Sequence, residues 1–308
     1  MRMILVPMKL FLLLAILNDC QLADADRTFV VEALHTWDEV RVKALRLPAD
    51  APLPRLIFFD ERCVFDGEDA SAHAGVIRLP DGNEVPPRVV TFAGSYGTGK
   101  PFVVQALPPI WRAEQRHREN PGLDRLMRSV FVHEMTHTVQ TPAFDERLTA
   151  LERRHKIDHL TDDIVQDRFA SDEAFVAAYK AERDLLYAIA AEPDPKLRRQ
   201  KAKDAVRMAR ARRERFFTGD VKYLNELEEI FLGMEGAAQW AAFRAAVDDG
   251  ATREEAIAMI NRGGRRWSQD EGLALFLAID ALMPGKWQAK VFGKRPAPVW
   301  ELLNDAAR

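Results

Sequence analysis

Two histidines and a glutamate near the middle of the chain have the types and spacing of a catalytic metal centre. His133 and His137 are four residues apart in the segment VFVHEMTHTV, residues 130–139. On an α-helix, residues four apart lie on one face, so both imidazoles can bind the same ion. Glu134 lies one step around the helix, where its carboxylate can reach a water molecule on that ion. The pattern therefore predicts metal-assisted hydrolysis.

The pattern H-E-x-x-H resembles the active-site helix of the zincin superfamily of metallopeptidases. The resemblance rests on that helix, on a β-rich region before it and on one later helix. It implies that Zn²⁺ is the cofactor and that a zinc-bound water attacks a peptide carbonyl, with Glu134 as general base. The metzincin branch is excluded, because it needs a glycine at Gln140 and a histidine at Ala143.

A second segment, LEEIFLGMEGAAQW at residues 227–240, is similar to the glutamate helix of gluzincins with a long spacer between their two motifs. In it, Glu235 is followed by Gly236, Ala237 and Ala238, which are small enough to let this helix approach the histidine helix. The resemblance implies that Glu235 is the third metal ligand. The fourth position would be left for water, as in catalytic zinc sites.

Other residues compete with Glu235 for the third ligand position. His155 and His159 are again four apart, and Asp162 and Asp163 would suit an aspartate-type zincin. The neighbours of the two histidines are highly charged, which favours exposed helix residues. The Gly-Thr-x-Asp context of the aspartate type is absent. His155, His159 and Asp163 remain the alternatives.

Peptide hydrolysis also needs a donor that stabilises the developing oxyanion. Tyr179, Tyr187 and Tyr223 are available in the helical part of the chain, and the sequence does not distinguish among them. Gln140, about one turn beyond His137, is expected to face the metal side and to support a ligand through a hydrogen bond.

The residues before the motif indicate a small sheet. Helical spacing over 31–45 ends at a proline-rich stretch, and β-rich runs follow at 55–59, 75–79, 88–92 and 101–106. The zincin resemblance implies that residues 101–107 are the edge strand that pairs with extended substrate. The glycine-rich stretch 94–100 imitates a phosphate loop, but Pro101 follows it where Ser or Thr is required, so we expect a hairpin.

From residue 120 onward the sequence predicts helices. Asn120-Pro121 is a good helix start, and Thr141-Pro142 is expected to end that helix. Capping boxes predict further starts at Thr252 and Ser268. Ten of the twenty residues 196–215 are Lys or Arg. This composition favours a solvated helix face, with an anionic partner as the alternative.

Together these elements predict an α+β, zincin-like fold. We expect a small N-terminal mixed sheet packed on a predominantly helical C-terminal part, with the active-site cleft between them. The expected organisation is a signal peptide at 1–25, a β-rich part at 26–119 and a helical part at 120–308, with 26–308 forming one catalytic unit.

The first residues have the pattern of a secretory signal peptide. Basic residues precede an apolar run at 10–17 that is too short to span a bilayer, and Ala23-Asp24-Ala25 matches a cleavage site. Cleavage after Ala25 would remove Cys20 and leave Cys63 as a lone buried thiol, so no disulfide is expected. The protein is expected to be secreted or periplasmic.

Composition narrows the function further. The chain has 308 residues, 47% of them hydrophobic, and a formal net charge of -3. It can bury an ordinary core, and it has no overall positive field to hold nucleic acid. We expect an exported zinc metallopeptidase that acts on a peptide or protein substrate and is not inserted stably in a membrane after signal cleavage. The alternatives are a zinc hydrolase of a non-peptide amide and a non-catalytic zinc-binding protein, although the intact Glu134 argues against the latter.

Overall fold

The computed structural model describes residues 20–67, 69–114, 122–157, 160–261 and 263–308. Most of the expected signal peptide, Asn120-Pro121 and His159 lie outside these ranges. The chain divides into two compact units, Met1–Asp38 with Ala49–Thr138, and Glu39–Pro48 with Val139–Arg308. The division falls within one continuous helix, α3 (Leu123–His155). A mixed sheet in the first unit and helices in the second confirm the α+β class.

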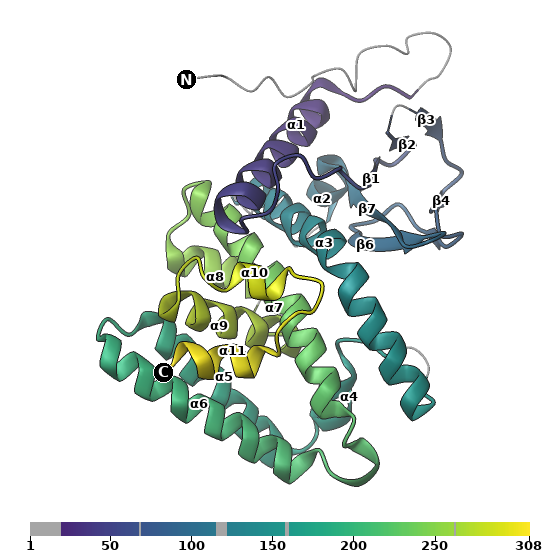
Figure 1. Ribbon diagram of the computed structural model, residues 1–308. Helices are drawn as coiled ribbons and strands as arrows, with labels where there is room; N and C mark the ends of the chain where they lie inside the picture. Colours follow the sequence, from purple (N-terminus) through teal and green to yellow (C-terminus); the bar gives the residue numbers. More distant parts are fainter. Residues whose placement is uncertain (1–19, 68, 115–121, 158–159, 262) are drawn as a thin grey trace. The chain divides into compact units, whose positions relative to one another are not determined.

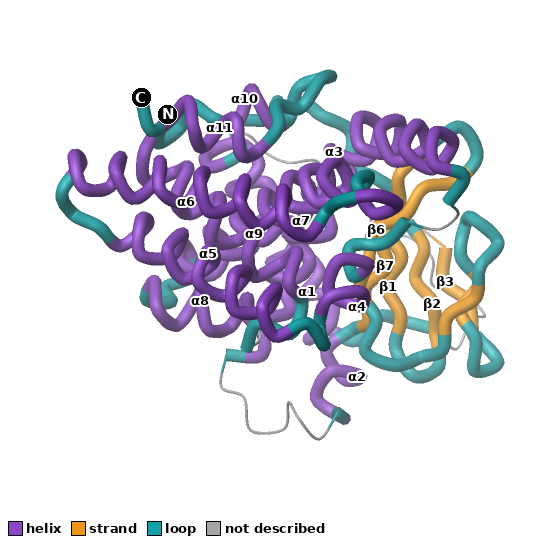
Figure 2. The backbone as a smooth tube through the Cα atoms, turned by 90° about the horizontal axis from the view of Figure 1, so that it is seen from below, coloured by secondary structure: helices purple, strands orange, loops and turns teal. Residues whose placement is uncertain are grey.

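The first unit contains a five-stranded mixed sheet with strand order β3-β2-β1-β7-β6 (Figure 2). The only parallel pair in this sheet is β1 with β7, and the other neighbours are antiparallel. The strands are β1 (Arg55–Phe59), β2 (Cys63–Asp66), β3 (Asp69–Ala72), β6 (Thr91–Tyr96) and β7 (Lys100–Ala106). A separate hairpin joins β4 (Ile77–Arg78) to β5 (Glu84–Val85).

The strand expected at the sheet edge is in fact internal. β7 lies between β1 and β6, and β6 forms the edge. Two glycines in the connecting turn, Gly97 and Gly99, have positive φ angles of 58° and 82° and fold β6 back onto β7. This is the hairpin expected for the glycine-rich stretch. Residues 102–104 of β7 are all apolar and buried, a pattern typical of a strand covered on both faces.

A disulfide joins Cys20 to Cys63, so the expectation of a lone thiol is wrong. Their Cα atoms lie 5.7 Å apart, and Cys63 is buried as expected. The bridge ties the segment before α1 (Asp24–Glu39) to β2. The small residues Ala23 and Ala25 predict the cleavage point, but a cut after Ala25 falls within the first turn of α1. It would leave Cys20 joined to the rest of the chain only through the disulfide. A short π-helical turn, Val40–Ala44, follows this helix; helix α2 (Pro108–Ala113) follows β7.

Helix α3 continues well past the position where Thr141-Pro142 was expected to end it. Pro142 lies inside the helix. Proline removes one backbone hydrogen bond, but Phe144 and Leu151 beyond it are 1% and 0% exposed and belong to the core of the second unit. Packing of these side chains stabilises the extension. In the first unit, the Phe131 ring of α3 stacks on Phe58 of β1 at 5.9 Å, which fixes the helix on that sheet face.

The second unit is an assembly of helices (Figure 1). Among them α7 (Leu224–Asp248) is buried along most of its length. The other helices of this unit are α4 (Ile164–Phe169), α5 (Glu173–Ala191), α6 (Pro195–Phe216), α8 (Arg253–Asn261), α9 (Trp267–Leu282), α10 (Gln288–Val291) and α11 (Val299–Ala306); a 3₁₀ turn, Gly219–Val221, precedes α7. Among the described helices, none is both long and apolar enough to cross a membrane.

Gly236 of α7 packs against α9, whereas it was expected to allow close approach to the histidine helix. A Cβ on Gly236 would lie 2.7 Å from the carbonyl oxygen of Gly272 on α9. Gly236 therefore allows close contact with α9, whereas Gly233 of α7 faces α3, beside the Phe144 ring. The capping box at Thr252 is confirmed by reciprocal hydrogen bonds with Glu255. The one at Ser268 is wrong, since α9 begins at Trp267.

Candidate metal centre

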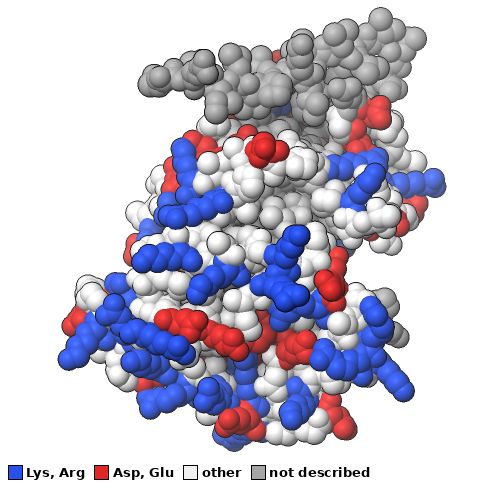
Figure 3. Space-filling view, in the orientation of Figure 1, with Lys and Arg blue, Asp and Glu red and all other residues white. Residues whose placement is uncertain are grey.

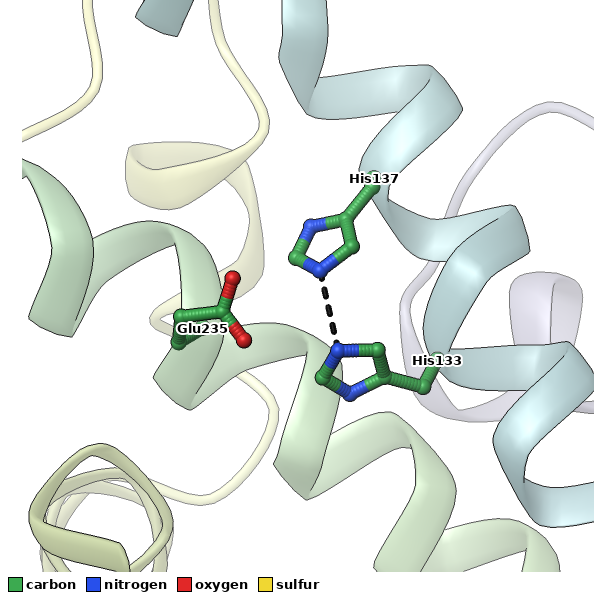
Figure 4. A group of neighbouring side chains, drawn as sticks. All are labelled: His133, His137 and Glu235. Atoms are coloured by element: carbon green, nitrogen blue, oxygen red, sulfur yellow. Dashed lines mark hydrogen bonds between the residues drawn. The ribbon is translucent and has the colours of Figure 1, made fainter. Parts of the chain in front are cut away.

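The two histidines lie on one face of α3, as their spacing predicts. Their Nε2 atoms are 2.9 Å apart (Figure 4), and the His133 ring is buried while His137 is half-buried. The threonines of this segment are accommodated within the helix, because the Thr136 and Thr138 hydroxyls donate to the carbonyls of Val132 and Met135. The segment that presents the imidazoles is helical throughout.

Glu235 of α7 completes a three-residue group with the histidines. One ligand atom from each residue lies within 4.8 Å of the others, and the carboxylate points toward the two rings (Figure 4). In the described part of the chain, no other group of three His, Cys, Asp or Glu side chains has this convergence. The group can therefore hold a metal ion.

A hydrogen bond from Gln140 joins α3 to α7 next to Glu235. The Gln140 side-chain amide donates to the carbonyl of Met234 over 3.1 Å. Gln140 lies three residues after His137 on the same continuous helix, and Met234 directly precedes Glu235. The Gln140 side chain thus bonds to the backbone next to the Glu235 carboxylate.

The donor set fits zinc in type and in spacing. Tetrahedral Zn²⁺ with bonds of about 2.0–2.1 Å keeps its ligand atoms about 3.3 Å apart. The distance of 2.9 Å between the imidazole nitrogens and the limit of 4.8 Å for the whole group bracket this value.

Glu134 lies next to the group without belonging to it. Its Oε2 accepts a hydrogen bond from the backbone N–H of Ala93 over 3.0 Å. Ala93 belongs to the edge strand β6, which pairs with β7 on its other side. A carboxylate oriented in this way is available for proton transfer close to the imidazoles.

The rival ligands lie elsewhere. His155 is exposed at the end of α3, with its ring 5.5 Å from that of Tyr223, and His159 lies outside the described residues. Asp163 forms an ion pair with Arg266. None of the described rivals joins the group formed by Glu235 and the two histidines.

The candidate oxyanion donors have other partners. The Tyr179 hydroxyl donates to the carbonyl of Trp267, and the Tyr187 hydroxyl donates to the Asp270 carboxylate. Both tyrosines therefore bind the start of α9. Tyr223 lies three turns before Glu235 on the chain, next to His155. The oxyanion donor is not identified among them.

The first turn of α9 contributes contacts that the sequence did not reveal. The Gln269 side-chain amide donates to Oε2 of Glu235 over 3.2 Å. The neighbouring Ser268 hydroxyl donates to Asp162. Burial, followed by the nearby Glu235 carboxylate, raises the pKa of Asp162. Two carboxylates thus lie at the N-terminus of α9, where the helix dipole favours negative charge.

A buried ionic cluster anchors α7 two turns before Glu235. The Arg212 guanidinium of α6 binds Glu182, Glu228 and Glu271, and Arg213 binds Glu228. Although burial opposes it, the charge of the two arginines holds the pKa of Glu228 below its usual range. Burial and the adjacent Glu182 hold the pKa of Glu271 well above its usual range. The surroundings of the cluster therefore favour the ionised form of Glu228 and the neutral form of Glu271.

Comparisons with protein-family models, with curated proteins and with solved structures give no match. The function is therefore inferred from the chemistry of the site.

Proposed function

We propose that the chain is a zinc-dependent metallopeptidase in which His133, His137 and Glu235 hold the metal and Glu134 is the general base. The observation that carries this proposal is the convergence of three ligand atoms within 4.8 Å. Two imidazoles and one carboxylate suit Zn²⁺ and leave a coordination position open. A bound Zn²⁺ would polarise the substrate carbonyl and lower the pKa of a water molecule to about 7.

Glu134 supplies the proton transfer in this proposal. The Ala93 N–H orients its carboxylate, which can take a proton from the attacking water and deliver it to the leaving nitrogen. A structural zinc site has no use for an oriented carboxylate that is not a ligand. The oriented Glu134 carboxylate therefore favours catalysis over a non-catalytic zinc-binding role.

The edge strand β6 supports a peptide as the substrate. Because the Ala93 N–H binds Glu134, it does not bind β7. Ser95 lies two residues after Ala93, so its backbone N–H and C=O point the same way, away from β7. The residue opposite Ser95 on β7 is Pro101, which has no backbone N–H to donate. The outward N–H and C=O groups of Ser95 and the C=O of Ala93 can pair with an extended chain beside the general base.

Export from the cytoplasm belongs to the same proposal. The Cys20–Cys63 disulfide is typical of proteins in oxidising compartments. The apolar N-terminal run has the composition of an export signal.

The substitution Glu134→Gln tests the assignment. Zinc should remain near one per chain, while digestion of an unbiased peptide library should fall by about 10²-fold or more, because the base is lost and the ligands are kept. Glu146→Gln, at an exposed position on the same helix, serves as the control and should retain activity. Unchanged turnover in Glu134→Gln would refute the base. A zinc-loaded wild-type protein that cleaves no peptide would refute the proposed peptidase activity. Non-peptide amides would then be the substrates to test.

A further inference from the structure

Helix α6 carries a line of positive charge along its exposed side. Five of its basic residues are exposed and lie within about 80° of one another around the helix. They span about 21 Å at 1.5 Å per residue. We call them the basic stripe: Lys196, Arg199, Lys203, Arg207 and Arg210. Lys and Arg side chains gather over this helix in the space-filling view (Figure 3).

The basic residues of α6 fall into two groups according to their partners. Those away from the stripe are used by the fold: Arg198 binds the carbonyls of Glu192 and Ala281, Lys201 binds Glu192, Arg212 and Arg213 bind buried carboxylates, and Arg215 lies over the Phe216 ring. In the stripe, Arg207 pairs with Asp204. Within the described chain, the other four stripe residues have no side-chain partner.

The four stripe residues without a side-chain partner form no ion pair that would stabilise the helix. Like charges three or four residues apart on a helix repel each other. The opposite face of α6 is buried through Ala202, Ala205 and Ala209, so the fold needs only that face. The stripe therefore has the character of a binding surface.

We propose that the basic stripe binds a linear phosphate polymer outside the metal centre. Successive stripe residues are about 4.5 or 6 Å apart along the axis, so a single extended polyanion can meet each cation in turn. Lysine and arginine both donate charge-assisted hydrogen bonds to phosphate oxygens. The proposal is independent of the proposed peptidase activity.

The surroundings of the stripe favour a polymer over a membrane. Asp194 precedes it and Glu214 follows it, and both are exposed, so the basic strip is short and bounded by negative charge. A flat anionic bilayer would meet these carboxylates as well. The stripe also has no aromatic residue on which nucleic-acid bases could stack, so recognition would involve phosphate alone.

The test measures binding of the full chain to fluorescently labelled linear inorganic polyphosphate. The log of the association constant should fall against log salt with a slope of about 3.5, at about 0.7 per phosphate contact for five contacts. A variant with Lys196, Arg199, Lys203 and Arg210 changed to Gln should bind at least about tenfold more weakly, with a slope below about 1. Gln preserves helix propensity, and circular dichroism checks the fold.

A charge-matched control changes four exposed lysines elsewhere in the second unit, Lys222, Lys286, Lys290 and Lys294, to Gln. It should retain polyphosphate binding. Equal loss in both variants would overturn the stripe as the site, and absence of binding by the unmodified chain would overturn the proposal outright. Binding to phosphatidylglycerol vesicles without binding to polyphosphate would assign the stripe to a membrane and refute the polymer. Should the fourfold variant fold poorly, Arg199→Gln with Lys203→Gln should give an intermediate loss.

Discussion

At the residue scale, the third ligand depends on a hydrogen bond that holds it in place. A carboxylate that binds a metal through one oxygen is commonly oriented through the other. Gln269 makes this contact with Oε2 of Glu235. Gln269 is therefore a positioning residue in the proposed site.

We predict that Glu235→Ala abolishes tight zinc binding, because it removes a ligand from the metal. Gln269→Ala should weaken zinc binding by about 10–100-fold, as is usual when a supporting hydrogen bond is lost. Competition with a chromophoric chelator measures both affinities. Gln200→Ala, at an exposed position on α6, is the control and should bind normally. Unaltered metal content in Glu235→Ala would mean that the third ligand lies elsewhere.

The residues that sequence could identify are those whose role follows from local geometry. His133, Glu134 and His137 share one helical segment, so their relative positions on the helix could be predicted from their spacing. The prediction of Glu235 as a ligand depended on the resemblance of residues 227–240 to the glutamate helix of gluzincins. Gln269 and Ala93 act through contacts across 34 and 41 residues of chain, and no local pattern marks them. The misassigned capping box at Ser268 was the one signal that polar side chains gather at the start of α9.

At the element scale, α7 is positioned by the close approach of α9. Gly236 and Gly272 meet backbone to backbone, and a methyl group on Gly236 would also lie 2.6 Å from the Phe276 ring. Backbone atoms cannot move aside as a flexible side chain can. Gly233, on the face toward Phe144, has ordinary contact distances of 3.4 Å or more.

Gly236→Ala should therefore lower the free energy of unfolding by about 1–3 kcal/mol through overpacking. Gly233→Ala should be neutral or stabilise by up to about 1 kcal/mol, because alanine favours a helix. Urea denaturation of the metal-free protein measures both. The reverse order of stability would show that α9 can withdraw from α7 without cost.

Element boundaries were predictable where side-chain chemistry acts locally and not where packing decides. The hairpin turn at Gly97 and Gly99 and the capping box at Thr252 follow local rules. Pro142 breaks the local rule, because the residues beyond it are buried in the second unit. The positions of β6 and β7 in the sheet depend on partners that a single strand does not reveal.

At the scale of the whole molecule, covalent and ionic links join segments that are distant in sequence. The Cys20–Cys63 bridge closes a loop with a sequence separation of 43 in the first unit. The Arg212 cluster joins α5, α6, α7 and α9 in the second.

Reduction of the bridge should lower the stability of the first unit by about 4 kcal/mol, the loop-closure entropy expected for a loop of this length. Guanidinium unfolding with and without a phosphine reductant measures the change. A double variant, Cys20→Ser with Cys63→Ser, should be less stable and indifferent to the reductant. If the unmodified chain unfolds at the same midpoint after complete reduction, the bridge contributes nothing to folding.

The same bridge governs how the protein can be made in the laboratory. A recombinant chain that begins at Asp26 would carry Cys63 without its disulfide partner, and two such chains could be cross-linked through this unpaired thiol during purification. A chain that begins ahead of Cys20 and is directed to an oxidising compartment would form the bridge as it folds. Metal loading and peptide digestion are best measured on that form.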